Sequence, residues 1–153
     1  TGSLRALDIR AVFRGAGIDT ELYLDPLQLL WQKFIVLSSL SSVTSAARTR
    51  PKELFAFHGA RKMFCDAMEE ALAVGLAKGV NLSDNLAHEC MEWIDSLPAF
   101  QVSMHGDFEA GRPTELDSLS GAVIRLGKQV GVKTPVHELL YSVLLPHKDG
   151  RAS

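Results

Sequence analysis

The segment from Pro26 to Ala47 constrains the fold more than any other, because it is long, apolar and carries one charged residue, Lys33. Asp25 is a good N-cap and proline is favoured at the first helical position, so a helix is predicted from Asp25 to about Ala47. Its centre is apolar on every side, which is typical of a helix enclosed by other elements. The same apolar excess would also suit the interface of a homodimer, and the sequence leaves both alternatives open.

Apolar residues at helical spacing, with prolines and glycines between the runs, predict more helices before and after this segment. The expected elements are a short helix over 4–16, an extended strand or lead-in over 18–24, and helices over 51–78, 83–97, 113–131 and 134–145. The stretch 100–112 loses the period and contains Gly106 and Gly111, so a non-helical loop is predicted there. The chain is therefore expected to be all-α, a helical bundle around one core, with a frayed tail from His147.

Length and charge narrow the classes of function. The 153 residues are about one domain, and 16 Lys plus Arg against 18 Asp plus Glu give a formal charge of −2. The sequence therefore gives no excess of basic residues of the kind that binds nucleic acid or an anionic membrane surface. The longest uncharged run, between Lys33 and Arg48, is too short to span a membrane. Two cysteines, Cys65 and Cys90, cannot form a disulfide framework, which favours a cytoplasmic location.

Motifs for metals and dinucleotides are missing from the sequence. His88 and Cys90 are two residues apart on a predicted helix and so lie on different faces, and neither C-x-x-C nor H-E-x-x-H spacing occurs. No metal site is expected. Gly15 and Gly17 resemble the start of a dinucleotide fingerprint, but the third glycine would fall at Thr20 and no strand precedes them.

Lys33 is the first candidate for chemistry. Lysine is rarely buried unless it is paired, and burial lowers the pKa of an amine toward the range useful for proton transfer. The alternative, which periodicity alone favours, is that its methylenes lie on apolar surface while the ammonium reaches water. Steps of four and eight residues place Leu37 and Ser41 on the same helix face, where they could line a pocket or let another helix approach closely.

A second group of polar residues lies between positions 103 and 117. Glu115 and Asp117 fall in the first turns of the helix expected from Pro113, where carboxylates favour the helix dipole, so a capping role would explain both. Asp107 and Arg112 could form a surface ion pair that contributes little to stability.

An ordered set of motifs resembles a known family. The motifs are Trp31-Gln32-Lys33, Ser103-Met104 with Asp107, Arg112 with Thr114-Glu115-Leu116-Asp117, Gly121, and Gly131-Val132-Lys133-Thr134-Pro135. Together they resemble the C-terminal domain of ketopantoate reductases (2-dehydropantoate 2-reductases). The resemblance implies a helical domain over residues 17–147, similar to the C-terminal domain of 6-phosphogluconate dehydrogenases, that follows a Rossmann domain.

The resemblance also implies an activity, the reduction of 2-dehydropantoate, a 2-keto acid, to pantoate with NADPH in pantothenate biosynthesis. Lys33 would donate a proton to the keto oxygen, Ser103 and Ser41 would occupy substrate-binding positions, and Glu115 would lie beside the cofactor and the lysine. Residues 1–16 would be a connector helix or the end of a missing nucleotide-binding domain, and residues 148–153 a tail. Because that domain holds most of the NADPH, this chain alone is expected to be inactive.

Three positions depart from the family pattern. Leu37 and Ser41 stand where the family usually has asparagines that grip the substrate, and Ser120 replaces the asparagine before Gly121. Because Leu37 can neither donate nor accept a hydrogen bond, a buried polar group of ketopantoate would lose a partner there. Two alternatives follow: a reductase for a different 2-keto acid, and a non-catalytic helical module that serves dimerisation or ligand binding.

Overall fold

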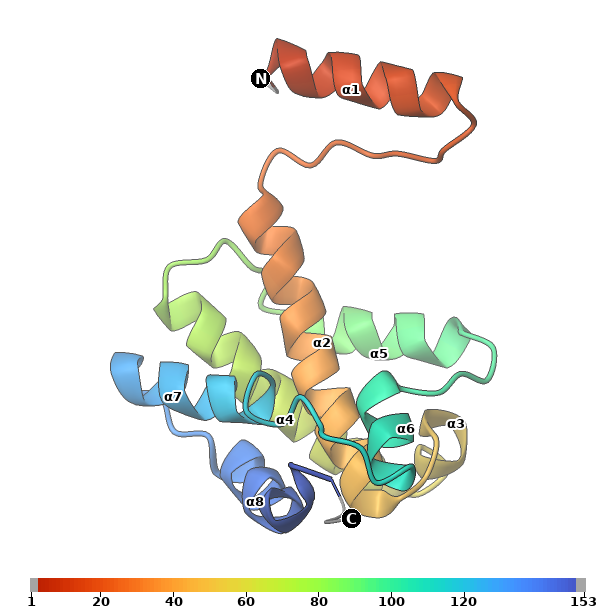
Figure 1. Cartoon of the computed structure of the whole chain (residues 1–153). Helices are drawn as coiled ribbons and strands as arrows, with labels where there is room; N and C mark the ends of the chain where they lie inside the picture. The colour runs from red at the N-terminus through yellow and green to blue at the C-terminus, as the bar shows by residue number, and fades with distance from the viewer. Residues whose placement is uncertain (1–2, 151–153) are drawn as a thin grey trace.

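The computed structural model describes residues 3–150, and within that range the fold is all-α (Figure 1). The elements are α1 (Leu4–Gly15), α2 (Pro26–Ala47), α3 (Pro51–Leu54), α4 (His58–Ala77), α5 (Leu86–Ser96), α6 (Ser103–Glu109), α7 (Ser120–Val130), α8 (Pro135–Leu144) and a 3-10 turn, η1 (Leu145–His147). No strand occurs between residues 3 and 150. The predicted all-α class is therefore confirmed, and the segment 18–24 is a lead-in to α2 rather than a strand.

Helix α2 is the axis of the bundle, and α4, α6 and α8 pack against it (Figure 1). The Asp25 carboxylate accepts hydrogen bonds from the backbone N–H groups of Leu27 at 3.0 Å and Gln28 at 3.2 Å, which confirms the predicted N-cap. Most residues of 35–45 are buried, whereas Leu27 and Leu30 near the start of the helix are exposed. The apolar excess of α2 is therefore divided between the core and the surface.

Hydroxyl groups in the buried half of α2 bond to carbonyl groups of their own helix. The Ser39 hydroxyl donates to the Ile35 carbonyl at 2.9 Å, and the Thr44 hydroxyl donates to the Leu40 carbonyl at 2.7 Å. These bonds satisfy polar groups that burial would otherwise leave unpaired. Because serine is also small, this half of α2 allows neighbouring helices to approach closely.

Two predictions for the middle of the chain were wrong: one helix is divided in two, and one predicted loop contains a helix. The helix expected over 51–78 is divided into α3 and α4, because Phe57 adopts an extended backbone with φ −98° and ψ 116°. The stretch 100–112, expected to be a loop, contains α6, which packs against α2 and buries Met104 and His105. A helix of seven residues with two buried side chains is too short to produce a visible period in the sequence.

The helix expected from Pro113 begins instead at Ser120. The backbone N–H of Thr114 donates to the Lys148 carbonyl at 2.7 Å, which holds this part of the chain against the C-terminal segment. For the same reason residues 147–150 are not frayed, in contrast to the prediction. Residues 151–153 of the expected tail, and residues 1–2 of the expected connector, lie outside the described residues.

Asp117 joins two elements instead of capping α7. Its carboxylate accepts hydrogen bonds from the Tyr141 hydroxyl at 2.6 Å and the Lys148 ammonium at 2.9 Å. Hydrogen bonding to Tyr141 and Lys148 lowers the pKa of Asp117. The ion pair expected between Asp107 and Arg112 is confirmed, with 2.7 Å between Oδ1 and Nη2.

Helix α1 lies apart from the bundle, at the end of the lead-in segment (Figure 1). None of its residues is buried, and Leu4 and Val12 expose 81% and 70% of their surface. The Arg14 guanidinium donates to the Thr20 carbonyl at 3.0 Å, which joins the helix to the lead-in. An apolar helix surface of this kind has no partner among residues 3–150.

Glu70 on α4 acts as the N-cap of α8 from a distant part of the sequence. Its carboxylate accepts hydrogen bonds from the backbone N–H groups of Val136 at 2.7 Å and His137 at 3.0 Å. The local N-cap residue, Thr134, makes no side-chain bond to the helix. The first turn of α8 therefore depends on a tertiary contact with α4.

Glu70→Ala is expected to lower the free energy of unfolding by about 1–2 kcal/mol, because two N–H groups of the first turn lose their acceptors. Urea denaturation followed by circular dichroism measures the change. Glu69→Ala is the matched control, since Glu69 is the neighbouring residue on α4 and is exposed. Equal stability losses in the two variants would contradict the capping role of Glu70.

Candidate functional site

A groove of about 680 Å³ lies beside Lys33, between α2 and α5. This volume is within the usual range of small-molecule sites. The lead-in, α2, α5 and the segment before α6 supply the lining residues Tyr23, Leu29, Gln32, Lys33, Val36, Leu37, Leu40, Leu86, Glu89, Cys90, Trp93 and Phe100. The groove is therefore a tertiary feature that brings together residues far apart in the sequence.

Lys33 is exposed at the start of the third turn of α2. None of the six ion pairs found among residues 3–150 includes it, so the contact expected between Lys33 and Glu115 is not formed at ion-pairing distance. The exposed side chain agrees with the alternative in which the ammonium reaches water. The same placement leaves the ammonium free to meet a ligand in the groove.

The other predicted site residues do not line the groove. Ser41 is buried, with 2% of its surface exposed, two turns beyond Lys33 on α2. Ser103 is the exposed first residue of α6, and Glu115 is exposed in the loop before α7. Phe100, three residues before Ser103, does line the groove, so the chain passes from this wall directly to Ser103.

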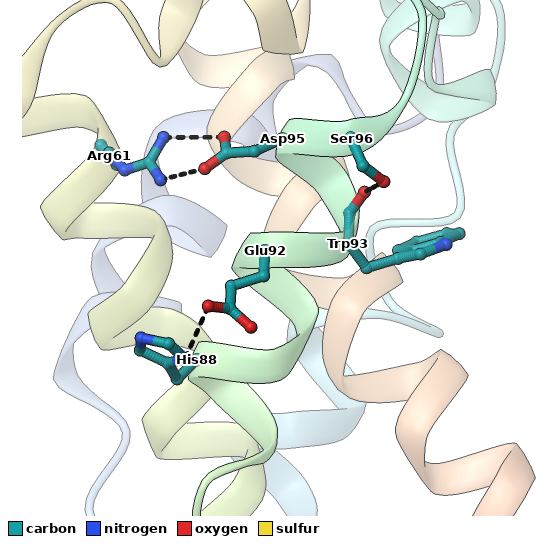
Figure 2. A network of polar contacts seen from close by, with 6 residues as sticks. All are labelled: Arg61, His88, Glu92, Trp93, Asp95 and Ser96. Carbon is teal, nitrogen blue, oxygen red and sulfur yellow. Dashed lines mark hydrogen bonds and ion pairs between the residues drawn. The ribbon is translucent and has the colours of Figure 1, made fainter.

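Helix α5 forms the opposite wall of the groove, which the sequence did not predict. Figure 2 shows the Trp93 ring projecting from α5 away from the side that meets Arg61 of α4. Trp93 is 57% exposed and lines the groove. Trp93 follows Leu86 by seven residues and so lies at the edge of the apolar face of this helix, where a large aromatic residue was the available signal of a second apolar surface.

A bidentate ion pair fastens α5 to α4 (Figure 2). The Arg61 guanidinium donates two hydrogen bonds to the Asp95 carboxylate, one of them at 2.9 Å. Hydrogen bonding to Arg61 lowers the pKa of Asp95. On the outer surface of α5, His88 and Glu92 are 3.9 Å apart, and neither lines the groove.

Two lining residues of α5 carry ionisable groups. Burial raises the pKa of the Cys90 thiol, with the Glu89 carboxylate adding to the shift, so the thiol stays protonated and acts as a small apolar contact. The Ser83 hydroxyl donates to the Glu89 carboxylate at 3.2 Å. The charged groups of the lining are therefore one ammonium, at Lys33, and one carboxylate, at Glu89.

Ser120 belongs to a buried hydrogen-bond chain and not to the groove. Its hydroxyl lies 2.6 Å from the Ser42 hydroxyl and 2.9 Å from His137 Nδ1, and His137 Nε2 lies 3.0 Å from the Ala67 carbonyl. Because a carbonyl only accepts, Nε2 carries the proton, Nδ1 accepts from Ser120, and Ser42 donates to Ser120. Burial lowers the pKa of His137 to about 4, which keeps the ring neutral near pH 7.

Within residues 3–150, no three or more His, Cys, Asp or Glu side chains gather closely enough to hold a metal ion. In the same part of the chain, no helix has the length and apolar character needed to cross a membrane.

Several comparisons with known proteins find ketopantoate reductases. The family model described as ketopantoate reductase PanE/ApbA C terminal matches residues 25–148. The 2-dehydropantoate 2-reductase of Caulobacter vibrioides is 27% identical over 135 residues, which are 88% of this chain and 46% of the relative.

Solved structures agree in fold. A PanE/ApbA family ketopantoate reductase from Ralstonia eutropha JMP134 is 25% identical and superposes with a TM-score of 0.85 over 95% of this chain and 49% of its own. A ketopantoate reductase from Staphylococcus aureus described as dimeric is 21% identical, with a TM-score of 0.83 over 97% of this chain and 52% of its own. The chain thus spans about half the length of these relatives.

Proposed function

This chain belongs to the ketopantoate reductase family, whose C-terminal domain it matches, and from that premise we propose that it is the substrate-binding and catalytic helical domain of an NADPH-dependent 2-keto acid reductase. The observation that carries the proposal is Lys33, exposed and unpaired among residues 3–150, in the wall of a groove of about 680 Å³. The reaction converts 2-dehydropantoate, or a related 2-keto acid, into the 2-hydroxy acid.

The proposed chemistry needs a proton at one defined atom. NADPH, when bound, supplies the hydride that adds to the carbonyl carbon. Lys33 donates a hydrogen bond and then a proton to the keto oxygen, so that an alcohol forms rather than a free alkoxide. A substrate bound on the apolar walls displaces water from them, and the hydrogen bond from Lys33 to the keto oxygen is stronger where less water competes for it.

Most contacts to NADPH are assigned to a nucleotide-binding domain that precedes residue 17. Residues 3–150 contain no strand followed by a glycine-rich turn, which is the usual cradle for the phosphates of a dinucleotide. From this chain, Lys33 and the exposed carboxylate of Glu115 are the groups proposed to face the cofactor. The chain alone is accordingly expected to be inactive.

Helix α1 supports this division of the chain. We assign residues 1–16 to the connector or to the end of the nucleotide-binding domain, because α1 buries no residue and exposes apolar side chains such as Leu4 and Val12. Residues 17–147 form the helical domain, and 148–153 are its tail. Substrate contacts are proposed for Ser103, exposed at the start of α6, and for Ser41, which becomes accessible only if neighbouring side chains move.

A homodimer is also proposed. A second, shallow groove of about 250 Å³ between α2 and α7 is lined by Leu27, Leu30, Trp31, Phe34, Ala122 and Leu126. Exposed apolar surface of this kind is typical of subunit interfaces, and the Staphylococcus aureus relative is described as dimeric. Sedimentation velocity of the purified protein tests the proposal, and a monomer at micromolar concentration would contradict it.

The cytoplasmic location stays a prediction.

The test of the proposed function is an assay of the full-length gene product that contains this chain. NADPH oxidation is followed with ketopantoate and a panel of other 2-keto acids, and NADH is tried in parallel. Turnover of at least one acid is expected from the full-length protein, and none from residues 1–153 alone. No turnover with any acid and either cofactor would overturn the reductase and favour a non-catalytic module for dimerisation or ligand binding.

A further inference from the structure

The groove beside Lys33 is walled mainly by apolar side chains. The apolar set, from α2, α5 and the segment before α6, is Leu29, Val36, Leu37, Leu40, Leu86, Cys90, Trp93 and Phe100. The two aromatic members come from α5 and from the segment before α6, and so face α2 from other elements. An apolar lining of this extent favours an apolar ligand.

The polar groups of the lining are few, and two of them already have partners. The Tyr23 hydroxyl donates to Glu21 at 2.8 Å, and Glu89 accepts from Ser83 at 3.2 Å. Gln32 precedes Lys33 on α2 and is half-buried. The Lys33 ammonium is therefore the one free charged donor of the lining, beside the neutral amide of Gln32 and the indole N–H of Trp93.

The position of Leu37 decides which part of a ligand meets apolar surface. It follows Lys33 by one helical turn on the same face of α2, so a molecule held by the ammonium lies against the Leu37 side chain. A hydroxyl group buried there would lose its hydrogen bonds to water and gain none. An alkyl or aryl group would instead lose only unfavourable contact with water.

The two charges of the lining set the direction of the ligand. A keto acid carries its carboxylate next to the carbonyl, so attraction to Lys33 places both groups at the ammonium. The Glu89 carboxylate repels the carboxylate of a keto acid, which adds to the preference for the ammonium. The side chain of the acid then lies along the apolar walls, where the Trp93 and Phe100 rings can pack against it.

We propose that the preferred substrate is a 2-keto acid with a bulky apolar side chain, aromatic or branched aliphatic, and not the hydroxylated ketopantoate. This inference rests on the proposed reductase function and specifies its substrate class. Leu37, Trp93 and Phe100 are the specificity-determining residues. They select by excluding a polar side chain and by packing on an apolar one.

The experiment compares kcat/KM of the full-length protein for phenylpyruvate, 2-oxo-4-methylpentanoate, ketopantoate and pyruvate, with saturating NADPH. The two bulky apolar acids are expected to exceed ketopantoate and pyruvate by at least tenfold. A ketopantoate value equal to or above those of the apolar acids would overturn the substrate class while leaving the reductase intact. Failure of all four acids would instead count against the reductase function itself.

Two substitutions connect this preference to the groove. Leu37→Asn is expected to lower the ratio of kcat/KM for phenylpyruvate over ketopantoate by at least tenfold, because an amide there can bond to a hydroxyl. Leu139→Asn is the matched control, since Leu139 is 60% exposed on α8 and does not line the groove. An unchanged ratio in a folded Leu37→Asn protein would overturn the assignment.

Trp93→Ala gives a second test that leaves the core intact, because Trp93 is 57% exposed. Its kcat/KM for phenylpyruvate is expected to fall at least fivefold more than its kcat/KM for pyruvate, which has no bulky side chain to pack on the ring. Equal losses for both acids would contradict packing of the substrate side chain on Trp93.

Discussion

Lys33→Ala is expected to lower kcat of the full-length reductase by about 10²–10⁴-fold, the usual contribution of a positioned general acid. The alkoxide that develops when hydride reaches the carbonyl carbon would then have to take its proton from water. Since Lys33 is exposed and has no ion-pair partner among residues 3–150, alanine leaves no buried charge behind. The loss should therefore appear in turnover and not in stability, with thermal unfolding as the check.

Lys33→Arg separates proton donation from simple attraction of charge. Arginine keeps the positive charge but does not release a proton at accessible pH, so substrate binding should be retained while kcat stays low. Lys133→Ala serves as the control, because Lys133 is also exposed but lies between α7 and α8. Turnover of Lys33→Ala equal to that of the control would remove Lys33 from the mechanism, although the protein would still be a reductase.

The parts of the fold that could be predicted are those whose signals are local. Asp25 and Pro26 mark the start of α2, and Gly131, with φ 73°, ends α7 as expected. Helix α6 was missed because its stability comes from packing on α2 and not from a long period. The capping of α8 by Glu70 also could not be predicted, because Glu70 is more than sixty residues away in sequence.

Of the candidate site, only the residues on α2 could be predicted from the sequence. Lys33 stands out because no other charge accompanies it on α2, and Leu37 follows from the helical spacing. The opposite wall, with Trp93 and Phe100, depends on how α5 and the segment before α6 pack beside α2. No residue pattern along one element contains that information, which is why the apolar character of the groove emerges only from the fold.

Lowering the pH from 6.5 to 4 is expected to reduce the free energy of unfolding by up to about 3 kcal/mol through His137 alone. Burial lowers the pKa of His137 in the folded protein from 6.5 to about 4. The unfolded chain therefore binds a proton first, and protonation favours unfolding throughout this interval. The stabilisation is complete above pH 6.5, and below pH 4 both states are protonated, so this group adds no further change.

His137→Gln should flatten this pH dependence and also lower stability at pH 7 by about 1–3 kcal/mol, since Ser120 and the Ala67 carbonyl lose well-placed partners. Urea denaturation at pH 7 and pH 4.5 measures both effects, and His88→Gln, with 76% of its side chain exposed, is the control. If the two variants had the same pH dependence as the unmodified protein, His137 would not be the titrating group. Because the chain Ser42–Ser120–His137–Ala67 joins α2, α7, α8 and α4, its protonation should loosen the whole bundle and not one helix alone.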